Sequence, residues 1–178
     1  MKTTPLALAG VALAAIAALG TAQIERLSLE QMVAKTDNAV FGTITGKQVF
    51  RIDHPVDGPE LFFTTLTIQG QSLRTNQLMT VDVTFAGGFI DDETGVHNSE
   101  APADDEVRVG NKVVAFYKWT DNMGGGLAAN ALYAAHGGLY TSHESRKGTI
   151  IQGRGEGYAI GANVDLATLN TRIASLAK

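Results

Sequence analysis

The residues best suited to chemistry lie in one acidic segment near the middle of the chain. Residues 91–106 read DDETGVHNSEAPADDE and hold seven acids, one histidine and no Lys or Arg. Carboxylates crowded into one segment repel one another unless water or a cation screens their charge. Ca²⁺ is a hard cation that prefers oxygen ligands. The segment therefore predicts a calcium site whose ligands would be Asp91, Asp92, Glu93, Asp104, Asp105 and Glu106.

The spacing of these acids leaves a second interpretation open. The calcium loop of an EF-hand places ligands at alternate positions and Gly at the sixth, whereas Gly95 is the fifth residue counted from Asp91. A solvated loop whose charge keeps the protein soluble would have the same composition. The calcium site and the solvated loop both stand as hypotheses.

Histidines and hydroxyls give weaker indications of catalysis. His136 and His143 flank a Gly-Gly pair, so paired strands would let them face each other, with Glu144 or His97 as a third metal ligand. Ser142, His143 and Glu144 are the residue types of a catalytic triad, but neighbours on a strand point to opposite faces. We predict no catalytic residues from these patterns.

Three aromatic residues are candidates for binding a partner. Phe63, Tyr117 and Trp119 fall out of phase with the apolar rows expected for the core, which predicts a patch on the outer face of a sheet. Aromatic side chains are enriched in binding hot spots. Beside Gly-rich turns, such a patch would suit a protein or a glycan. Helices packed on the same face would instead bury it.

The elements that must position these residues are mostly strands. The clearest runs of β-branched and aromatic residues are 39–50, 61–69, 78–85 and 112–119. In 78–85 the alternation is strict, with one face made of Met79, Val81, Val83 and Phe85. Gly42 and Gly46 are expected bend points in the first run, and shorter strands are predicted at 131–136, 138–143 and 148–152.

Two helices flank the predicted strands. Ser28 and Gln31 form a capping box for a helix over 28–36. Asp165 can cap a second helix, whose apolar stripe is Leu166, Leu169, Ile173 and Leu176. A helix, five to seven short antiparallel strands and a helix predict a mostly β fold, a small closed or half-closed barrel. Closure would remove exposed strand edges.

Residues 1–22 are predicted to be an export signal. Lys2 precedes an apolar run over 6–19, and Gly20-Thr21-Ala22 offers the small side chains expected for cleavage after Ala22. Residues 23–178 would then be a single domain, periplasmic or secreted, with no further membrane span.

The composition excludes several classes of protein. The chain has 178 residues, no Cys and a net charge of −4. A disulfide scaffold and a Cys-ligated zinc site are therefore excluded. The longest basic run is Arg146-Lys147, so no nucleic acid is expected as a partner.

Three stretches resemble an uncharacterised class of exported bacterial proteins. Leu27 to Thr45 looks like their opening L-x-x-L-V-x-x-S/A-D-x-V-V-x-G-x-V, and Val109 to Phe116 resembles their G-E-x-V-V-x-F strand. His136 to Tyr140 lies where they carry a Gly-rich, aromatic strand. The opening is also similar to the netrin-like barrels of tissue inhibitors of metalloproteinases, which implies an OB-like fold. Those inhibitors act through a disulfide-tethered N-terminal Cys, and this chain has no Cys.

The combined expectation is an exported, non-catalytic barrel that binds a protein or glycan partner. The alternative, from a different class, is a Ca²⁺-stabilised structural component of the cell surface or periplasm. A hydrolase is the third hypothesis.

Overall fold

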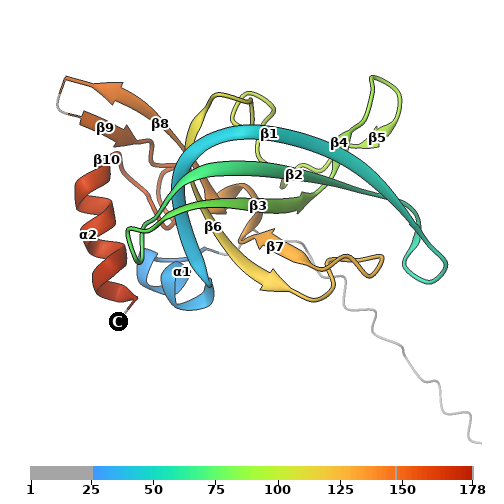
Figure 1. The fold of residues 1–178 in the computed structure, drawn as a ribbon, viewed down its shortest axis with the longest axis horizontal. Helices are drawn as coiled ribbons and strands as arrows, with labels where there is room; N and C mark the ends of the chain where they lie inside the picture. Colours follow the sequence, from blue (N-terminus) through green and yellow to red (C-terminus); the bar gives the residue numbers. More distant parts are fainter. Residues whose placement is uncertain (1–25, 147, 178) are drawn as a thin grey trace, which may run out of the picture.

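Strands are the main regular structure of the protein, for which a computed structural model describes residues 26–146 and 148–177 (Figure 1). In chain order the elements are α1 (Leu29–Lys35), β1 (Asn38–His54), β2 (Gly58–Ser72), β3 (Leu78–Ala86), β4 (Gly88–Phe89), β5 (Gly95–Val96), β6 (Lys112–Thr120), β7 (Ala129–Leu132), the 3-10 helix η1 (Ala135–Gly138), β8 (Leu139–Ser145), β9 (Gly148–Ile151), β10 (Val164–Asp165) and α2 (Leu166–Leu176). The predicted export signal lies outside the described residues.

Five strands close into a barrel in the order β1-β2-β3-β7-β6, with β6 hydrogen-bonded back to β1. The first half of β1 pairs with β2 on one edge and with β6 on the other, from Asn38↔Tyr117 to Thr43↔Lys112. Strands β8, β9 and β10 continue the sheet from β6. The prediction of a mostly β, closed barrel with two helices is confirmed.

The barrel is mixed, and the prediction of a wholly antiparallel sheet is wrong at one junction. Strand β3 runs parallel to β7 and meets it at Thr84↔Ala131, whereas the other neighbours in the barrel are antiparallel. The reason is geometric. When five strands alternate in direction around a closed ring, the odd number forces one neighbouring pair to run the same way.

The long strands β1 and β2 approach each other closely at a pair of glycines. Gly42 lies opposite Gly70, and a Cβ on Gly42 would come within 2.5 Å of the Gln69 carbonyl oxygen. A Cβ on Gly70 would overlap the Phe41 carbonyl oxygen. The register of β1 shifts between Ile44 and Gly46, which agrees with the predicted bend there.

Strand β6 separates two apolar cores. Its residues Val113, Ala115 and Tyr117 point into the barrel, where they pack with apolar side chains of β1, β2 and β3. The alternate residues Val114 and Phe116 pack outside the barrel, against the two helices and strands β8 and β9. An element buried on both faces has a continuous apolar sequence, and this explains the apolar run that predicted a central strand.

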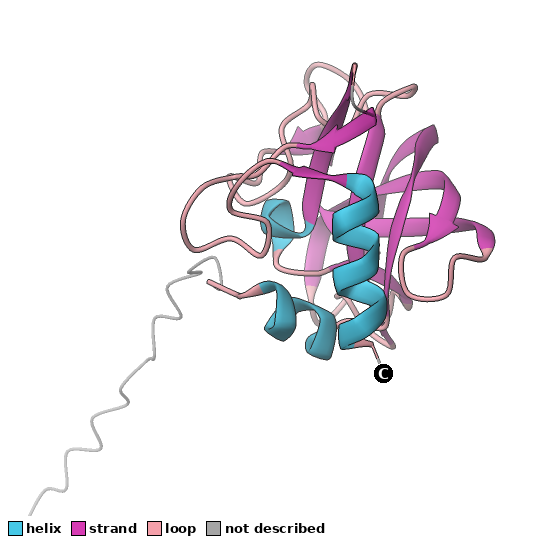
Figure 2. Cartoon of the chain, turned by 90° about the vertical axis from the view of Figure 1, so that its left-hand side faces the viewer, coloured by secondary structure: helices cyan, strands magenta, loops and turns pink. Residues whose placement is uncertain are grey.

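The two helices lie together on one side of the barrel (Figure 2). At α1, both bonds of the predicted capping box form: Gln31 N–H donates to Ser28 Oγ, and Ser28 N–H donates to Gln31 Oε1. At α2, Asp165 accepts from the Thr168 N–H at 2.8 Å. Arg74, from the turn between β2 and β3, donates to the carbonyls of Val33 and Thr36 at the end of α1.

The predicted strand over 131–136 ends early, at Leu132. Ala134 and Ala135 have φ angles of 55° and 51°, so the backbone turns into the left-handed region and continues as η1. Left-handed alanine is uncommon and has no sequence signature. The neighbouring predictions, 138–143 and 148–152, correspond to β8 and β9.

Replacement of Gly70 by Ala tests the close approach of β1 and β2. Because the new methyl group would overlap the Phe41 backbone, G70A should lower the free energy of unfolding by about 3 kcal/mol or more. In the control G46A, the methyl group would meet Thr67 at 3.4 Å, and the change should stay below about 1 kcal/mol. Urea denaturation measures both variants, and equal losses would contradict this account of the glycine pair.

The cap of α2 predicts a pH dependence. The pKa of Asp165 lies below its ordinary value because the carboxylate accepts backbone and side-chain hydrogen bonds from Thr168. A lowered folded-state pKa stabilises the fold above the unfolded pKa, and that stabilisation is lost as the pH falls through the folded pKa. The difference in Tm between wild type and D165N should therefore be largest near neutral pH and shrink below about pH 4. D165A, which has no capping side chain, should have a lower Tm than wild type at every pH. A wild-type advantage over D165N that is constant with pH would contradict this prediction.

Candidate functional site

The acidic segment 91–106 lies between β3 and β6 and covers one end of the barrel. Three contacts fix it there. The Asn98 side chain donates to the Ala86 carbonyl at 2.9 Å, the Lys47 ammonium pairs with Asp104 at 3.2 Å, and Arg154 pairs with Glu106 at 2.6 Å. The segment therefore has a defined path over the barrel.

The predicted calcium ligands make separate contacts. Asp91 accepts from the backbone N–H groups of Glu93 and Thr94, and these hydrogen bonds lower its pKa. Asp104 pairs with Lys47 of β1, whereas Glu106 pairs with Arg154, which follows β9. Within the described part of the chain, no group of three or more His, Asp or Glu side chains is arranged to hold a metal ion. Calcium binding by this segment stays a prediction.

His136 and His143, which paired strands would allow to face each other, do not lie on paired strands. His136 lies in η1, where its Nδ1 contacts the Glu100 carbonyl at 3.1 Å and its Nε2 contacts the Tyr158 hydroxyl at 3.0 Å. His143 lies on β8 opposite Ile150 of β9. The turn at Ala134 and Ala135 takes His136 out of the strand and places it under the acidic segment, where it has a structural role.

Only one of the three predicted partner-binding aromatics is exposed. Phe63 and Tyr117 are 3% and 6% exposed, whereas Trp119 is 51% exposed. Phe63 does lie on the outer face of β2, but the Phe50 ring covers it, with ring centroids 5.9 Å apart. Tyr117 points into the barrel, where its hydroxyl contacts the Met79 sulfur at 3.9 Å. The predicted three-residue exposed patch is therefore wrong.

The Trp119 side chain is held in place at the end of β6. Its backbone N–H donates to Asp37 at 2.7 Å, and its indole N–H donates to Asp121 at 2.9 Å. About half of the residue stays open to solvent, opposite Asn130 of β7. An aromatic ring that is exposed and also fixed by hydrogen bonds loses little side-chain entropy on binding a ligand.

Trp119 borders a groove of about 440 Å³ on the outside of the barrel, which we name the outer groove. Its lining comes from β1, β2, β3, the end of β6, and β7 with the residues before it: Phe50, Thr65, Thr80, Val81, Asp82, Thr84, Trp119, Leu127, Ala128, Ala129 and Asn130. The Thr65 and Thr84 hydroxyls are 2.8 Å apart, and Asn130 donates to the Asp82 carbonyl at 3.1 Å. The lining thus combines polar side chains with one exposed indole.

Two loops are joined beyond this groove. The turn between β1 and β2 contacts the loop between β6 and β7, where the Gly125 N–H donates to Asp57 at 2.7 Å. The contact ties the two long strands to the segment that carries Leu127 and Ala128 into the groove. The loop contact therefore fixes one wall of the groove relative to the other.

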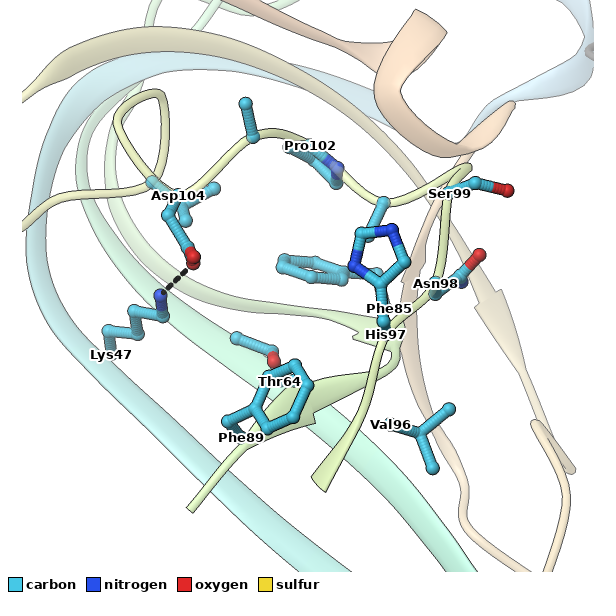
Figure 3. A pocket seen from close by; sticks show the side chains of 14 residues that line it. Lys47, Thr64, Phe85, Phe89, Val96, His97, Asn98, Ser99, Pro102 and Asp104 are labelled. Atoms are coloured by element: carbon cyan, nitrogen blue, oxygen red, sulfur yellow. Dashed lines mark hydrogen bonds and ion pairs between the residues drawn. The ribbon is translucent and has the colours of Figure 1, made fainter. Parts of the chain in front are cut away.

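A second hollow of about 500 Å³ lies where the acidic segment meets the barrel, and we name it the mouth pocket (Figure 3). The barrel contributes Lys47, Thr64 and Phe85, and the acidic segment contributes residues 96–99 and 101–104. In Figure 3 the Ser99 hydroxyl points away from the His97 ring. The residues drawn there form no Ser–His pair.

Sequence reasoning found Trp119 but missed the polar residues around it. Thr84 alternates with the apolar face predicted for 78–85, and no role is predicted from the sequence for it, for Thr65 or for Asn130. The alternation of Thr with apolar residues along β2 and β3 was the available signal, since it places a row of hydroxyls on one outer face.

Comparisons with protein-family models, curated proteins and solved structures found no match to the chain. Over the described residues, no helix has both the length and the apolar character needed to cross a membrane.

Removal of the Arg154 side chain tests what anchors the acidic segment. Arg154 and Glu106 are 20% and 19% exposed, and Arg154 also donates to the Leu139 carbonyl at 2.9 Å. R154M leaves a largely buried carboxylate unpaired, so the free energy of unfolding should fall by about 1.5–3 kcal/mol. Cleavage by protease within residues 97–107 should also become faster.

K112M is the matched control, because it removes a similar but exposed ion pair, Lys112–Glu144. K112M should leave the free energy of unfolding and the rate of protease cleavage close to those of wild type. Equal effects of R154M and K112M would show that the Arg154–Glu106 pair does not anchor the segment.

Proposed function

We propose that the protein is an exported, non-catalytic, OB-like barrel that binds a glycan in the outer groove. The observation that carries this proposal is a half-exposed, hydrogen-bonded Trp119 beside a row of hydroxyl, amide and carboxylate side chains. The volume of the outer groove, about 440 Å³, falls in the ordinary range of ligand sites.

The chemistry of the lining favours a glycan over a protein partner. A sugar ring presents an apolar C–H face that can stack on an indole and a rim of hydroxyls that both donate and accept. Thr65 and Thr80 offer hydroxyls with the same dual capacity, and Asp82 and Asn130 add an acceptor and an amide. Thr84 is buried, and its hydroxyl lies 2.8 Å from that of Thr65. A protein hot spot would bring more desolvated aromatic surface than one indole.

The strand order supports an OB-like fold. OB-folds are five-stranded Greek-key barrels that bind oligonucleotides or oligosaccharides on the face of strands two and three, between the loops joining strands one to two and four to five. In this barrel the corresponding elements are β2, β3, the β1–β2 turn and the β6–β7 loop. The outer groove lies on the same face. Acidic residues outnumber basic ones in the chain, which favours a sugar over a nucleic acid.

Export and the lack of catalysis follow as parts of the same proposal. The predicted signal at 1–22 would deliver the domain to the periplasm or the cell exterior, where glycans are abundant. Glycoside hydrolysis generally requires two carboxylates that flank the scissile bond. Among the described residues that line the outer groove, Asp82 is the one carboxylate.

Substitution of Trp119 tests the proposed function. A panel of soluble oligosaccharides should contain at least one that binds the wild-type protein, measured by calorimetry and by quenching of the indole fluorescence. W119A should weaken that binding at least about tenfold, because it removes the stacking surface, while W119F should retain part of it. V109A, which truncates an exposed apolar residue outside the groove, should bind as wild type does.

Two results would contradict the proposal. One is unchanged affinity in W119A with an unchanged melting temperature, which would place binding elsewhere. The other is the absence of binding to every oligosaccharide of the panel, which would exclude these glycans as ligands.

A further inference from the structure

The second half of β1 has an edge that is open to another chain. We propose that residues 47–53 on this edge, which we name the open edge, pair with the same residues of a second copy of the protein. The proposal does not depend on the glycan function. Three features carry it: the exposure of the edge, the direction of its backbone groups and the charges along it.

The open edge begins beyond the last contact of β1 with β6. Before that point β1 pairs with both β2 and β6, and Ile44 still exchanges backbone hydrogen bonds with Gly110 and Asn111. Counting the described residues alone, β2 is the one backbone partner of the stretch 47–53, which runs along the outside of β2 in Figure 1. No residue of this stretch is buried. Such an edge is a template for pairing with another strand.

Alternate residues of the stretch direct their N–H and C=O groups away from β2. The Gly87 N–H donates to the Phe62 carbonyl, so Phe62 faces β3 and its neighbour Phe63 faces β1. Phe50 lies opposite Phe63 and therefore faces β2. Neighbouring residues on a strand direct these groups to opposite edges. The donors and acceptors of the open edge thus belong to Lys47, Val49, Arg51 and Asp53.

A two-fold axis at Phe50 makes the open edge self-complementary. In antiparallel pairing about that axis, Lys47 of one copy lies opposite Asp53 of the other, and Val49 lies opposite Arg51. The opposite charges of Lys47 and Asp53 meet twice, once on each side of the axis. The two Phe50 side chains face each other at the axis. Opposite-charge pairs and aromatic pairs both stabilise neighbouring strands.

Shifted registers are less favourable. With the axis at Val49, Lys47 would lie opposite Arg51, and with the axis at Arg51, two guanidinium groups would oppose each other. With the axis at Ile52, the pairing would reach Pro55, which has no N–H to donate. Basic side chains on an edge discourage indiscriminate pairing. The charges therefore favour the register centred on Phe50.

The charged side chains of the open edge have partners in their own chain, and these partners leave room for a second copy. Lys47 pairs with Asp104 at 3.2 Å, and Arg51 pairs with Asp53 at 2.8 Å. The two carboxylates are 94% and 59% exposed, and exposed ion pairs contribute little free energy. A carboxylate can also accept several hydrogen bonds, so Asp53 can bind a second cation beside Arg51.

The pairing would place the outer grooves of both copies together. Phe50 lines the outer groove and also lies at the proposed axis. A two-fold axis perpendicular to the sheet keeps equivalent faces on the same side. The dimer would therefore present its two outer grooves on one face of a continuous sheet.

The molecular mass in solution tests the proposal. In sedimentation equilibrium, the chain from Gln23, which contains every described residue, should form a reversible dimer with a Kd of about 10–100 μM, as expected for a small interface. V49P removes an N–H of the open edge and keeps the hydrogen bonds between β1 and β2. It should weaken the dimer at least about tenfold, and a melting curve checks that the variant is folded.

Reversal of charges tests the register. K47D and D53K each place like charges opposite each other, so each should weaken the dimer about tenfold. Both also break an ion pair within the chain, and the double variant K47D/D53K breaks the same two pairs. Because the double variant restores opposite charges between copies, its Kd should return to within about threefold of wild type. E156K, which reverses one exposed charge in the loop after β9, should dimerise as wild type does.

A single cysteine tests the position of the axis. The chain has no Cys, so F50C introduces one thiol per copy. Facing residues at such an antiparallel position have Cα atoms about 4.5 Å apart, which suits a disulfide. Under mild oxidation, F50C should form a covalent dimer faster than V56C, whose residue lies 84% exposed in the β1–β2 turn, away from the axis.

A monomer at every concentration up to about 1 mM would overturn the proposal. So would a dimer that V49P leaves unchanged, because the contact would then lie elsewhere. Failure of K47D/D53K to recover, or equal cross-linking of F50C and V56C, would contradict the register. W119A should dimerise as wild type does, which distinguishes this proposal from that of the glycan site.

Discussion

The first half of β1 is hydrogen-bonded along both edges, and the barrel depends on this double pairing. It requires β1 and β2 to approach closely and coil, which the opposed Gly42 and Gly70 allow. Because five strands close the ring, β3 and β7 must run parallel, and they meet at one pair of residues, Thr84↔Ala131. The outer groove lies along this short junction, where a single bridging pair joins β3 and β7. The constraint that closes the barrel thus also produces the groove.

Polar side chains attach the outer parts of the fold to this barrel. Arg74 donates to the last carbonyls of α1, and burial lowers its pKa. Arg154 joins the acidic segment to β8, and its guanidinium lies 5.8 Å from the centre of the Tyr140 ring. Without a disulfide, such contacts define where the helices and the acidic segment lie.

The sequence was sufficient for features that depend on neighbouring residues. The capping box at Ser28, the cap at Asp165 and the alternating strand at 78–85 all formed as predicted, because local spacing determines them. It was insufficient where distant segments meet. Phe63 was predicted to lie exposed on an outer sheet face. It does lie on the outer face of β2, but the Phe50 ring of β1 covers it. The left-handed Ala134 and Ala135, which take His136 out of the predicted strand, have no sequence signature. The mouth pocket depends on Lys47 and Asp104, which lie 57 residues apart in the chain.

The most direct measurement of the central claim is an amide NMR titration of the ¹⁵N-labelled chain with the oligosaccharide that binds best. If the outer groove is the glycan site, the Trp119 indole signal and the amides of Thr65, Thr84 and Asn130 will shift together and saturate at one dissociation constant. The amides of residues 91–104 will remain in place. Shifts confined to those residues or to the two helices, with an unmoved Trp119 indole, would contradict the assignment of the glycan site to the outer groove.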